Sequence, residues 1–238
     1  MSVFTGSLRG TRILRSLFTA VVLSASFVPH AFADEATRPT NWATAIANVD
    51  GLGNLFQVSP ELYRSKQPSP KALQNILAGK AFIDGAAPVH TIVELLATRD
   101  VDGEVLRDSS GVRHEWLKFN PFHPVDADVV KFLQIVTTKS QQPVLVHCAQ
   151  GSDRTGMMVA IYRIVVQGWS KDDALKEMVD GGYGFHGVFQ DLVRYVRNLD
   201  VDALKNRVAQ AGPWEDKIGA LAQNATASAP ELHAASAR

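Results

Sequence analysis

The stretch Pro143-Val-Leu-Val-His-Cys-Ala-Gln-Gly-Ser-Asp-Arg-Thr-Gly156 places three structural signals in a row. Residues 143–146 form a short apolar run, which predicts a short β-strand in a sheet whose two faces are both covered. An apolar run of helical length follows at residues 157–166. A strand, a tight loop and a helix in this order turn successive backbone N–H groups toward one hollow at the helix N-terminus. Such a hollow binds anions, phosphate best of all, so the stretch predicts an α/β fold with a phosphate site at this loop.

The side chains of this loop add reactive and phosphate-binding chemistry. Cys148 is the only cysteine in the chain, and its thiolate, the reactive form, is favoured at a helix N-terminus. Arg154 is able to hold a phosphoryl group through two parallel hydrogen bonds. Gly151 permits a backbone turn that other residues disfavour, and Thr155 brings a hydroxyl near the sulfur, where it would stabilise the thiolate as a leaving group. We expect His147 to orient the loop rather than to take part in the chemistry.

The pattern His-Cys-(five residues)-Arg-Thr-Gly at residues 147–156 resembles the signature loop of the cysteine-dependent protein tyrosine and dual-specificity phosphatases. Further segments resemble a bacterial, periplasmic branch of small dual-specificity-like phosphatases: Leu62-Tyr63-Arg64-Ser65, residues 162–169, Glu177-Met178 and Gly181-Gly182. The resemblance covers residues 54–204. It implies the fold of a cysteine phosphatase, with Cys148 as the nucleophile and Arg154 as the phosphate clamp. The implied substrate-binding residues are Ala149, Gln150, Gly151, Ser152, Asp153, Arg154 and Thr155.

The reaction of that family also needs a general acid, usually an Asp on a mobile loop upstream of the nucleophile. The corresponding loop here, residues 119–126, has no Asp at the expected place, which falls nearer Phe122 or His123. Asp126 is the first candidate because it is the nearest carboxylate on that loop, although it also suits the N-cap of the following helix. His123 is the second, since an imidazole acts as an acid at neutral pH. Asp153 is the third, because an Asp before Arg-Thr inside the loop resembles the myotubularin lipid phosphatases; its other role would be to brace the loop.

The rest of the chain alternates between strand and helix signals, which predicts a mostly parallel central sheet flanked by helices on both faces. The expected strands are residues 54–58, 62–65, 91–96, 112–119 and 143–146, and the expected helices are residues 69–77, 127–136, 155–167, 171–179, 188–199 and 201–209. We interpret Arg64 and Lys66 as solvated charges of an edge strand, with a place at the phosphate site as the alternative. The aromatic segment 182–187 is expected to put its rings in the core, with a wall of the cleft as the alternative.

The two ends of the chain lie outside this pattern. Residues 1–33 combine three Arg and no acidic residue with a short apolar stretch and an Ala-Phe-Ala ending, which predicts a signal peptide cleaved before Asp34. The alternative is a retained membrane anchor, for which the apolar stretch is short. Export would place the protein in the periplasm or outside the cell. The expected parts that follow are an N-terminal arm at residues 34–53, a dual-specificity-like phosphatase domain at residues 54–212 and a flexible tail at residues 213–238.

Charge and composition narrow the class of partner. The chain has 24 basic and 24 acidic residues, and the leader holds three Arg, so the remainder carries a net charge of −3 and favours neither a nucleic acid nor an anionic membrane. The seven His and the one Cys show no metal-ligand spacing, and we expect no cofactor and no stable membrane insertion after cleavage.

The expected function is the hydrolysis of phosphate monoesters through a phosphocysteine intermediate. Phosphotyrosine in proteins is the first expectation, with phosphoserine or phosphothreonine next. The expected substrate is a phosphorylated protein, such as the extracytoplasmic part of a membrane signalling protein. The alternatives are a phosphoinositide or inositol phosphate phosphatase, an inactive phospho-ligand binding module and a rhodanese-type sulfur transferase.

Overall fold

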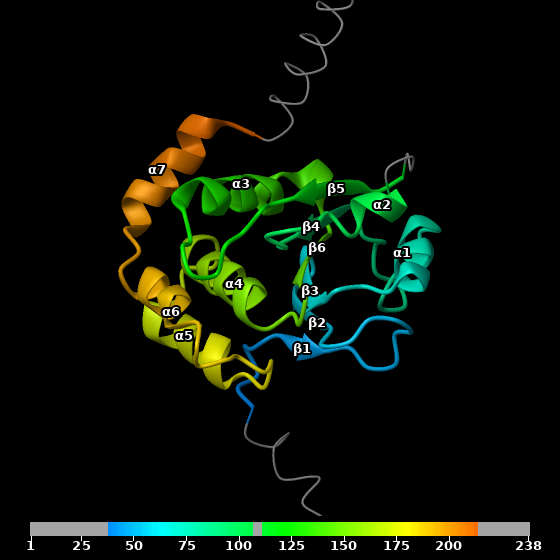
Figure 1. Cartoon of the computed structure of the whole chain (residues 1–238), viewed down its shortest axis with the longest axis horizontal. Helices are drawn as coiled ribbons and strands as arrows, with labels where there is room; N and C mark the ends of the chain where they lie inside the picture. The colour runs from blue at the N-terminus through cyan, green and yellow to red at the C-terminus, as the bar shows by residue number, and fades with distance from the viewer. Residues whose placement is uncertain (1–37, 107–110, 214–238) are drawn as a thin grey trace, which may run out of the picture. The chain divides into compact units, whose positions relative to one another are not determined.

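A computed structural model describes residues 38–106 and 111–213, and a six-stranded sheet lies at their centre (Figure 1). The expected signal peptide at residues 1–33 and residues 214–238 of the expected tail lie outside the described residues. The strands are β1 (Thr44–Ala45), β2 (Phe56–Ser59), β3 (Leu62–Lys66), β4 (Thr91–Glu94), β5 (Arg113–Trp116) and β6 (Val144–Cys148). Their order is β1-β2-β3-β6-β4-β5; β3, β6, β4 and β5 run parallel, and β1 and β2 are antiparallel. The predicted, mostly parallel sheet is confirmed.

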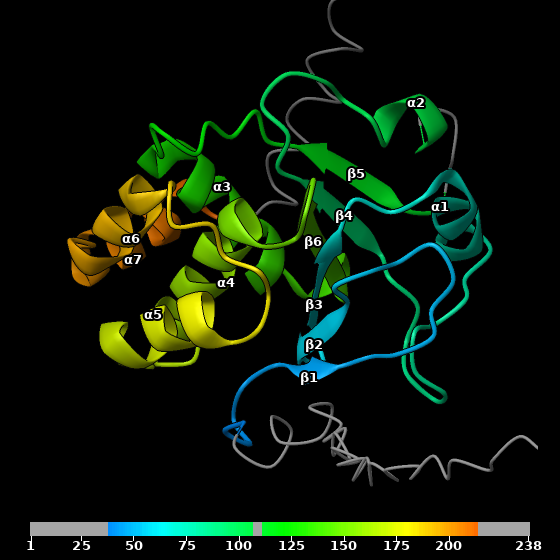
Figure 2. The same ribbon diagram turned by 60° about the horizontal axis from the view of Figure 1, so that its bottom comes forward.

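Helices cover both faces of this sheet, as predicted. They are α1 (Pro70–Leu77), α2 (Gly103–Leu106), α3 (Asp126–Thr137), α4 (Asp153–Val165), α5 (Lys171–Asp180), α6 (Gln190–Arg197) and α7 (Val201–Ala211). Figure 2 shows α1 and α2 on one side of the strands and α3 to α7 on the other. A 3₁₀ turn at Lys139–Gln141 precedes β6.

The alternation of side chains along β6 explains why two hydrophobic cores form. Val144 and Val146 belong to the core that β6 shares with α3 and α4, whereas Leu145 belongs to the core beneath α1. Successive side chains of a strand point to opposite faces, so a continuous apolar run is buried only when both faces are covered. The apolar run before Cys148 therefore belongs to β6, a central strand of the sheet.

Side-chain caps begin the helices α1 and α5 where the sequence indicates. The Ser69 hydroxyl accepts a hydrogen bond from the backbone N–H of Ala72, and Ser170 accepts one from Asp173. The expectation that Asp126 is the N-cap of α3 was wrong. This helix begins at Asp126 itself, and its N-cap is Val125, which makes no side-chain cap bond.

The expectation that Arg64 is a solvated edge charge was also wrong. β3 pairs with β2 on one side and with β6 on the other, so it is an inner strand. Arg64 in its middle is fully buried, and only Lys66 at its end is exposed. The edge beyond β2 is taken by β1, which pairs Thr44 with Gln57 and lies in a segment that the sequence did not mark as a strand. Tertiary pairing therefore moved β3 inward.

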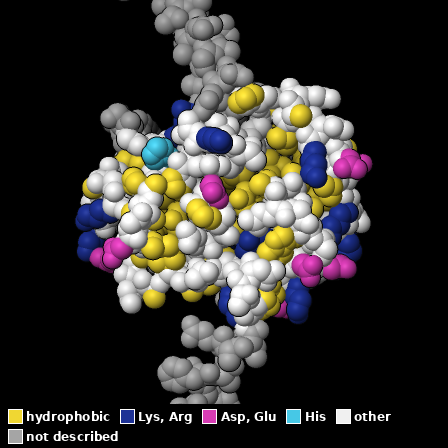
Figure 3. Space-filling view, turned by 180° about the vertical axis from the view of Figure 1, so that it is seen from behind, with side chains coloured by type: hydrophobic (Ala, Val, Ile, Leu, Met, Phe, Trp, Pro, Cys, Tyr) yellow, Lys and Arg dark blue, Asp and Glu magenta, His cyan; other side chains and the backbone are white. Residues whose placement is uncertain are grey.

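The surface of the described residues carries mixed charge. Figure 3 shows the face opposite to that of Figure 1, where basic and acidic side chains are interspersed among apolar and uncharged ones. No helix in the described ranges is both long enough and apolar enough to cross a membrane.

Candidate active site

The loop between β6 and α4 lies directly against the end of β3. We call the backbone of residues 149–154 the cradle. Gly151 has φ +72°, and a Cβ built at this position would lie 2.4 Å from the carbonyl oxygen of Ser65. The backbone N–H of Gln67 reaches the carbonyl of Ala149 at 3.3 Å. Only glycine combines this left-handed conformation with so close an approach, so Gly151 sets the turn that brings the cradle round after Cys148.

Cys148 and Arg154 stand at the two ends of the cradle. Cys148 is the last residue of β6 and its side chain is almost fully buried. Arg154 is the second residue of α4, and its Nη1 donates a hydrogen bond of 2.8 Å to the carbonyl oxygen of Leu95, just past β4. A guanidinium has five N–H donors, and this bond uses one of them. The fold thus brings together a thiol, a helix N-terminus and an oriented guanidinium.

A buried hydrogen bond supports His147, the residue before Cys148. The Nε2 atom of His147 lies 2.7 Å from Oδ2 of Asp102, and both side chains are fully buried. The backbone N–H of Asp102 in turn donates to Oε2 of Glu94 at 3.1 Å. Gln67 donates a short hydrogen bond to the other carboxylate oxygen of Asp102. This network holds the imidazole of His147 from the β4 side.

Sequence reasoning missed Asp102. The residue lies 45 positions before His147, in a charged segment that the sequence indicates as a loop or a short surface helix. Only the parallel pairing of β4 with β6 brings the two segments together. A charged residue in a polar loop gives no local signal that it will be buried.

Polar contacts from neighbouring segments hold the outer side of the cradle. The hydroxyl of Ser152 donates to the carbonyl oxygen of Tyr183 at 2.6 Å. The Asn54 side-chain amide donates to the carbonyls of both Gln150 and Tyr183. The Thr155 hydroxyl is buried and has no hydrogen-bond partner among the described residues. Tyr183 is itself buried, as predicted for the rings of this segment.

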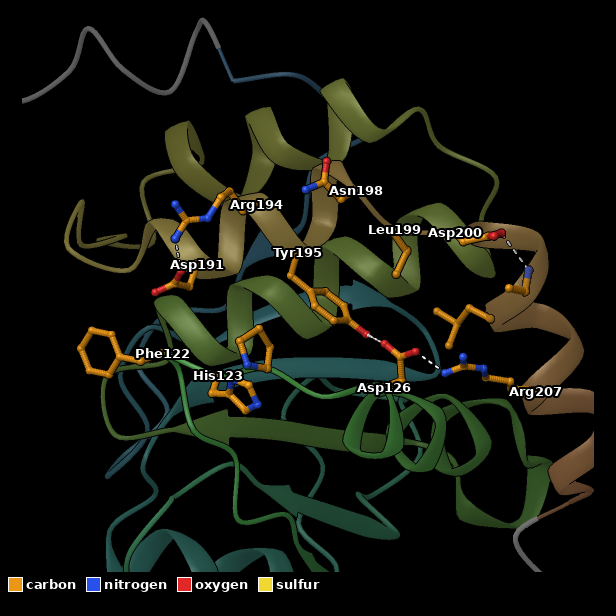
Figure 4. A pocket seen from close by; sticks show the side chains of 13 residues that line it. Phe122, His123, Asp126, Asp191, Arg194, Tyr195, Asn198, Leu199, Asp200 and Arg207 are labelled. Atoms are coloured by element: carbon orange, nitrogen blue, oxygen red, sulfur yellow. Dashed lines mark hydrogen bonds and ion pairs between the residues drawn. The ribbon is translucent and has the colours of Figure 1, made fainter.

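The first candidate for the general acid, Asp126, is engaged on both carboxylate oxygens. The hydroxyl of Tyr195 donates to Oδ1 at 2.5 Å, and Arg207 makes an ion pair with Oδ2. Burial and the hydrogen bond to Asp126 raise the pKa of Tyr195, so this phenol remains a donor at neutral pH. Asp126 and His123 line the same pocket of about 540 Å³, between the loop before α3 and the helices α6 and α7 (Figure 4). The cradle residues do not line this pocket.

The third candidate, Asp153, faces a different segment. Its Oδ1 accepts the backbone N–H of His186 at 2.7 Å, and its Oδ2 lies 2.9 Å from Nδ1 of the same residue. Asp153 is buried while the His186 side chain is about half exposed. Asp153 therefore anchors the segment after α5 to the first turn of α4.

A cluster of potential ligand atoms also went unnoticed in the sequence. Atoms of Glu94, Asp100 and His114 lie within 4.8 Å of one another. The two oxygens of Glu94 accept the backbone N–H groups of Val101 and Asp102, and Oε2 also lies 3.1 Å from Nε2 of His114. Hydrogen bonds within the chain thus account for this cluster as a structural feature.

Known proteins resemble this chain across the part that contains the cradle. A family described as DSP-PTPase phosphatase fused to NAD+ kinase matches residues 120–190, which include the cradle. The chain is 36% identical over 197 residues to the dual specificity protein phosphatase TpbA of Pseudomonas aeruginosa, covering 81% of this chain and 84% of that protein.

Solved structures give the same grouping. The crystal structure of TpbA superposes with a TM-score of 0.58 at 35% identity and covers 71% of this chain and 98% of TpbA. A cysteine-to-serine variant of TpbA in complex with phosphotyrosine gives 0.59 at 36% identity, covering 73% and 99%. The core catalytic domain of the S. cerevisiae PP-IP phosphatase SIW14 gives 0.56 at 20% identity, covering 69% and 96%, and shares the fold. Because one-third of the residues agree across most of both chains and the sheet has the same layered fold, this protein belongs to the dual-specificity protein phosphatase family.

Proposed function

We propose that this phosphatase hydrolyses phosphate monoesters on proteins, phosphotyrosine first, through a phosphocysteine intermediate on Cys148. The observation that carries the proposal is the placement of Cys148 and Arg154 at the two ends of one backbone cradle at a helix N-terminus. The crystallised complex of a TpbA variant with phosphotyrosine supports the choice of substrate. A phosphate bound in the cradle would accept hydrogen bonds from backbone N–H groups and from the guanidinium.

In the first step the thiolate of Cys148 attacks phosphorus in line with the ester oxygen. The S–P bond forms as the P–O bond breaks, and an acid gives its proton to the leaving oxygen. In the second step a water molecule gives a proton to the conjugate base of that acid as its oxygen attacks phosphorus, the S–P bond breaks, and inorganic phosphate and the thiolate are released. Arg154 and the cradle amides supply positive charge to the transferring phosphoryl group in both steps.

We propose Asp126 as the acid of the first step, with His123 and Asp153 as the alternatives. Asp126 reaches the leaving oxygen only if substrate binding opens its contacts with Tyr195 and Arg207. A leaving group with a low pKa departs without a proton, whereas phosphotyrosine needs one. Replacing the true acid, as in Asp126→Asn, should therefore lower kcat/KM, which reports the first step, by about 100-fold for a phosphotyrosine peptide and far less for p-nitrophenyl phosphate. The same comparison with His123→Gln and Asp153→Asn identifies the acid if Asp126→Asn shows no such difference.

The test of the function itself compares the purified chain with Cys148→Ser. Both are assayed with EDTA on a phosphotyrosine peptide, a phosphoserine peptide and a phosphoinositide. We expect turnover of the phosphotyrosine peptide above the other two, and its loss in Cys148→Ser. Turnover that survives in Cys148→Ser would refute the cysteine mechanism. A faster rate on the phosphoinositide than on the phosphotyrosine peptide would make phosphoinositides the substrate class. Binding of phosphate without turnover of any substrate would make this chain a binding module.

We also propose that the protein acts outside the cytoplasm, on the extracytoplasmic part of a membrane signalling protein. The basis is the leader at residues 1–33, with its three Arg, short apolar stretch and Ala-Phe-Ala ending. Cell fractionation followed by N-terminal sequencing checks this. A chain that begins at Asp34 in the periplasmic fraction is expected, and an uncleaved chain in the cytoplasm would refute it.

A further inference from the structure

Arg64 lies beneath the cradle, on the side away from solvent. It is the middle residue of β3, its register partner in β6 is Val146, and its side chain is fully buried. Its Nη2 donates a hydrogen bond of 2.7 Å to the carbonyl oxygen of Gly151, and the carbonyl of Ser152 lies at 3.5 Å from the same atom. The guanidinium therefore contacts two successive peptide groups of the cradle.

No carboxylate of the described residues makes a direct hydrogen bond to this guanidinium. One face lies 3.6 Å from the ring centre of Tyr183, and the atoms Nε and Nη1 are buried without a hydrogen-bond partner among the described residues. Glu177, the nearby acid, is occupied by Arg163, with hydrogen bonds of 2.7 and 2.9 Å. Burying a cation without a paired anion is costly, so the position needs a reason beyond packing.

The charge is present at neutral pH. Burial lowers the pKa of Arg64 to about 10, while Tyr183, Glu177 and Cys148 act in the opposite sense. The other charged or titratable groups near the cradle are His147 with Asp102, Asp153 with His186, Arg163 with Glu177, Arg38 near Tyr183, Arg154, and Lys66 at the end of β3. Of these, Asp102, Asp153 and Glu177 each have a cationic or imidazole partner of their own.

We propose that Arg64 is a positioning residue of the phosphate site: it holds the cradle carbonyls away from the anion and supplies a buried positive charge beneath the thiolate and the phosphate. This inference rests on the proposed function of the same loop. The C=O of Gly151 and the N–H of Ser152 belong to one planar trans peptide and point in opposite directions. When Arg64 draws the carbonyl to the underside, the N–H of Ser152 faces the other side, where the anion binds. The negative charge of the thiolate or of the bound phosphate then supplies the counter-charge that Arg64 lacks.

The lone cysteine makes a direct test possible without turnover. Alkylation of Cys148 by iodoacetamide is followed across pH in the full chain, and inorganic phosphate is titrated as a protecting ligand. The midpoint of the rate–pH profile reports the thiol–thiolate equilibrium, and the protection reports the phosphate dissociation constant. The variants are Arg64→Met, which removes the charge at similar length, and Arg64→Lys, which keeps a charge without the planar fork. The control is Lys205→Met, which removes a charge from the exposed face of α7.

In Arg64→Met we expect the midpoint of the alkylation rate–pH profile to rise by about one pH unit, and phosphate to bind about tenfold more weakly. In Arg64→Lys this midpoint returns toward the wild-type value, whereas phosphate binding stays weakened because one ammonium does not reproduce the fork and the stacked plane. Lys205→Met leaves both values unchanged. The melting temperature of Arg64→Met stays equal or rises, since an apolar residue in place of a buried charge is often neutral or stabilising.

Wild-type alkylation and wild-type phosphate protection in a folded Arg64→Met would overturn the proposal. A loss that merely follows a lower melting temperature would also overturn it, because Arg64 would then only support the fold. If Arg64→Met does not fold, Arg64→Lys decides: unchanged phosphate protection refutes the positioning role and weakened protection supports it. Absence of turnover in the wild-type chain would refute the proposed function and leave these two measurements unaffected.

Discussion

The sharpest perturbation of this site is the addition of one methyl group to the cradle, in Gly151→Ala. The new Cβ would lie 2.4 Å from the Ser65 carbonyl oxygen and 2.6 Å from the Lys66 nitrogen, whereas ordinary contacts begin at 3.4 Å. These atoms belong to the backbone of β3, which is hydrogen-bonded on both sides and does not yield easily. The cradle must therefore move by about 1 Å, because it is the less constrained partner.

The consequences divide into a conformational cost and a displacement. A residue other than glycine at a left-handed φ costs about 1–2 kcal/mol. A displacement of about 1 Å at a catalytic group lowers the rate by about 100-fold, which corresponds to about 2.7 kcal/mol in the barrier. We expect kcat/KM of Gly151→Ala for a phosphotyrosine peptide to fall by at least that factor, with phosphate protection of Cys148 weakened in parallel.

Gly168→Ala is the matched control. Gly168 has φ +73°, nearly the same as Gly151, but a Cβ there meets nothing within 4 Å. This variant therefore carries the conformational cost without the displacement, and it should lower the unfolding free energy by about 1–2 kcal/mol while leaving kcat/KM unchanged. If Gly151→Ala and Gly168→Ala lose the same stability and Gly151→Ala keeps its activity, the cradle does not depend on its close approach to β3, and the reasoning fails.

Two further predictions concern buried charges outside the cradle. Glu177→Ala leaves Arg163 as an unpaired buried cation, so it should lower the unfolding free energy by about 3–5 kcal/mol and the melting temperature by roughly 6–20 °C, while Asp180→Asn at an exposed pair changes little. Equal melting temperatures of Glu177→Ala and the wild-type chain, measured by calorimetry, would contradict this prediction. Burial lowers the pKa of His114, but the hydrogen bond to Glu94 and nearby acidic charges outweigh it, and the net pKa lies above 6.5. Protonated His114 therefore adds stability that is fully present below about pH 6 and is lost as the pH rises through the raised pKa. His114→Gln should lower the melting temperature more at acid than at alkaline pH. An equal loss of melting temperature at both pH values would refute this role of His114.

The loop that carries Cys148 and Arg154 could be located from the sequence because its signals are local. The apolar run before Cys148, the glycine inside the loop and the apolar run after Arg154 are contiguous, and each acts through short-range backbone preference. The helix expected at residues 69–77 was predictable for the same reason, since the signals that begin and end a helix are neighbours in the chain. Short-range preferences of this kind do not depend on how distant parts of the chain fold.

The surroundings of the loop were not predictable, because they depend on which strands become neighbours. The residues 62–65 gave a correct strand but no sign that β3 would be an inner strand with Arg64 buried beneath the cradle. In the same way, Asp102 reached His147 only through the pairing of β4 with β6. The position of Asp126 suited a helix N-cap, but its carboxylate accepts a hydrogen bond from Tyr195 and pairs with Arg207 instead.

The sequence by itself therefore determined the strand, loop and helix that present Cys148 and Arg154, because those preferences act over a few residues. The tertiary structure decided which charges support that loop, because parallel strands distant in the chain set the neighbours of each buried side chain. Arg64 shows the difference most clearly. Its type and its strand could be read from the sequence, but its burial against the cradle exists only when β2, β3 and β6 lie side by side.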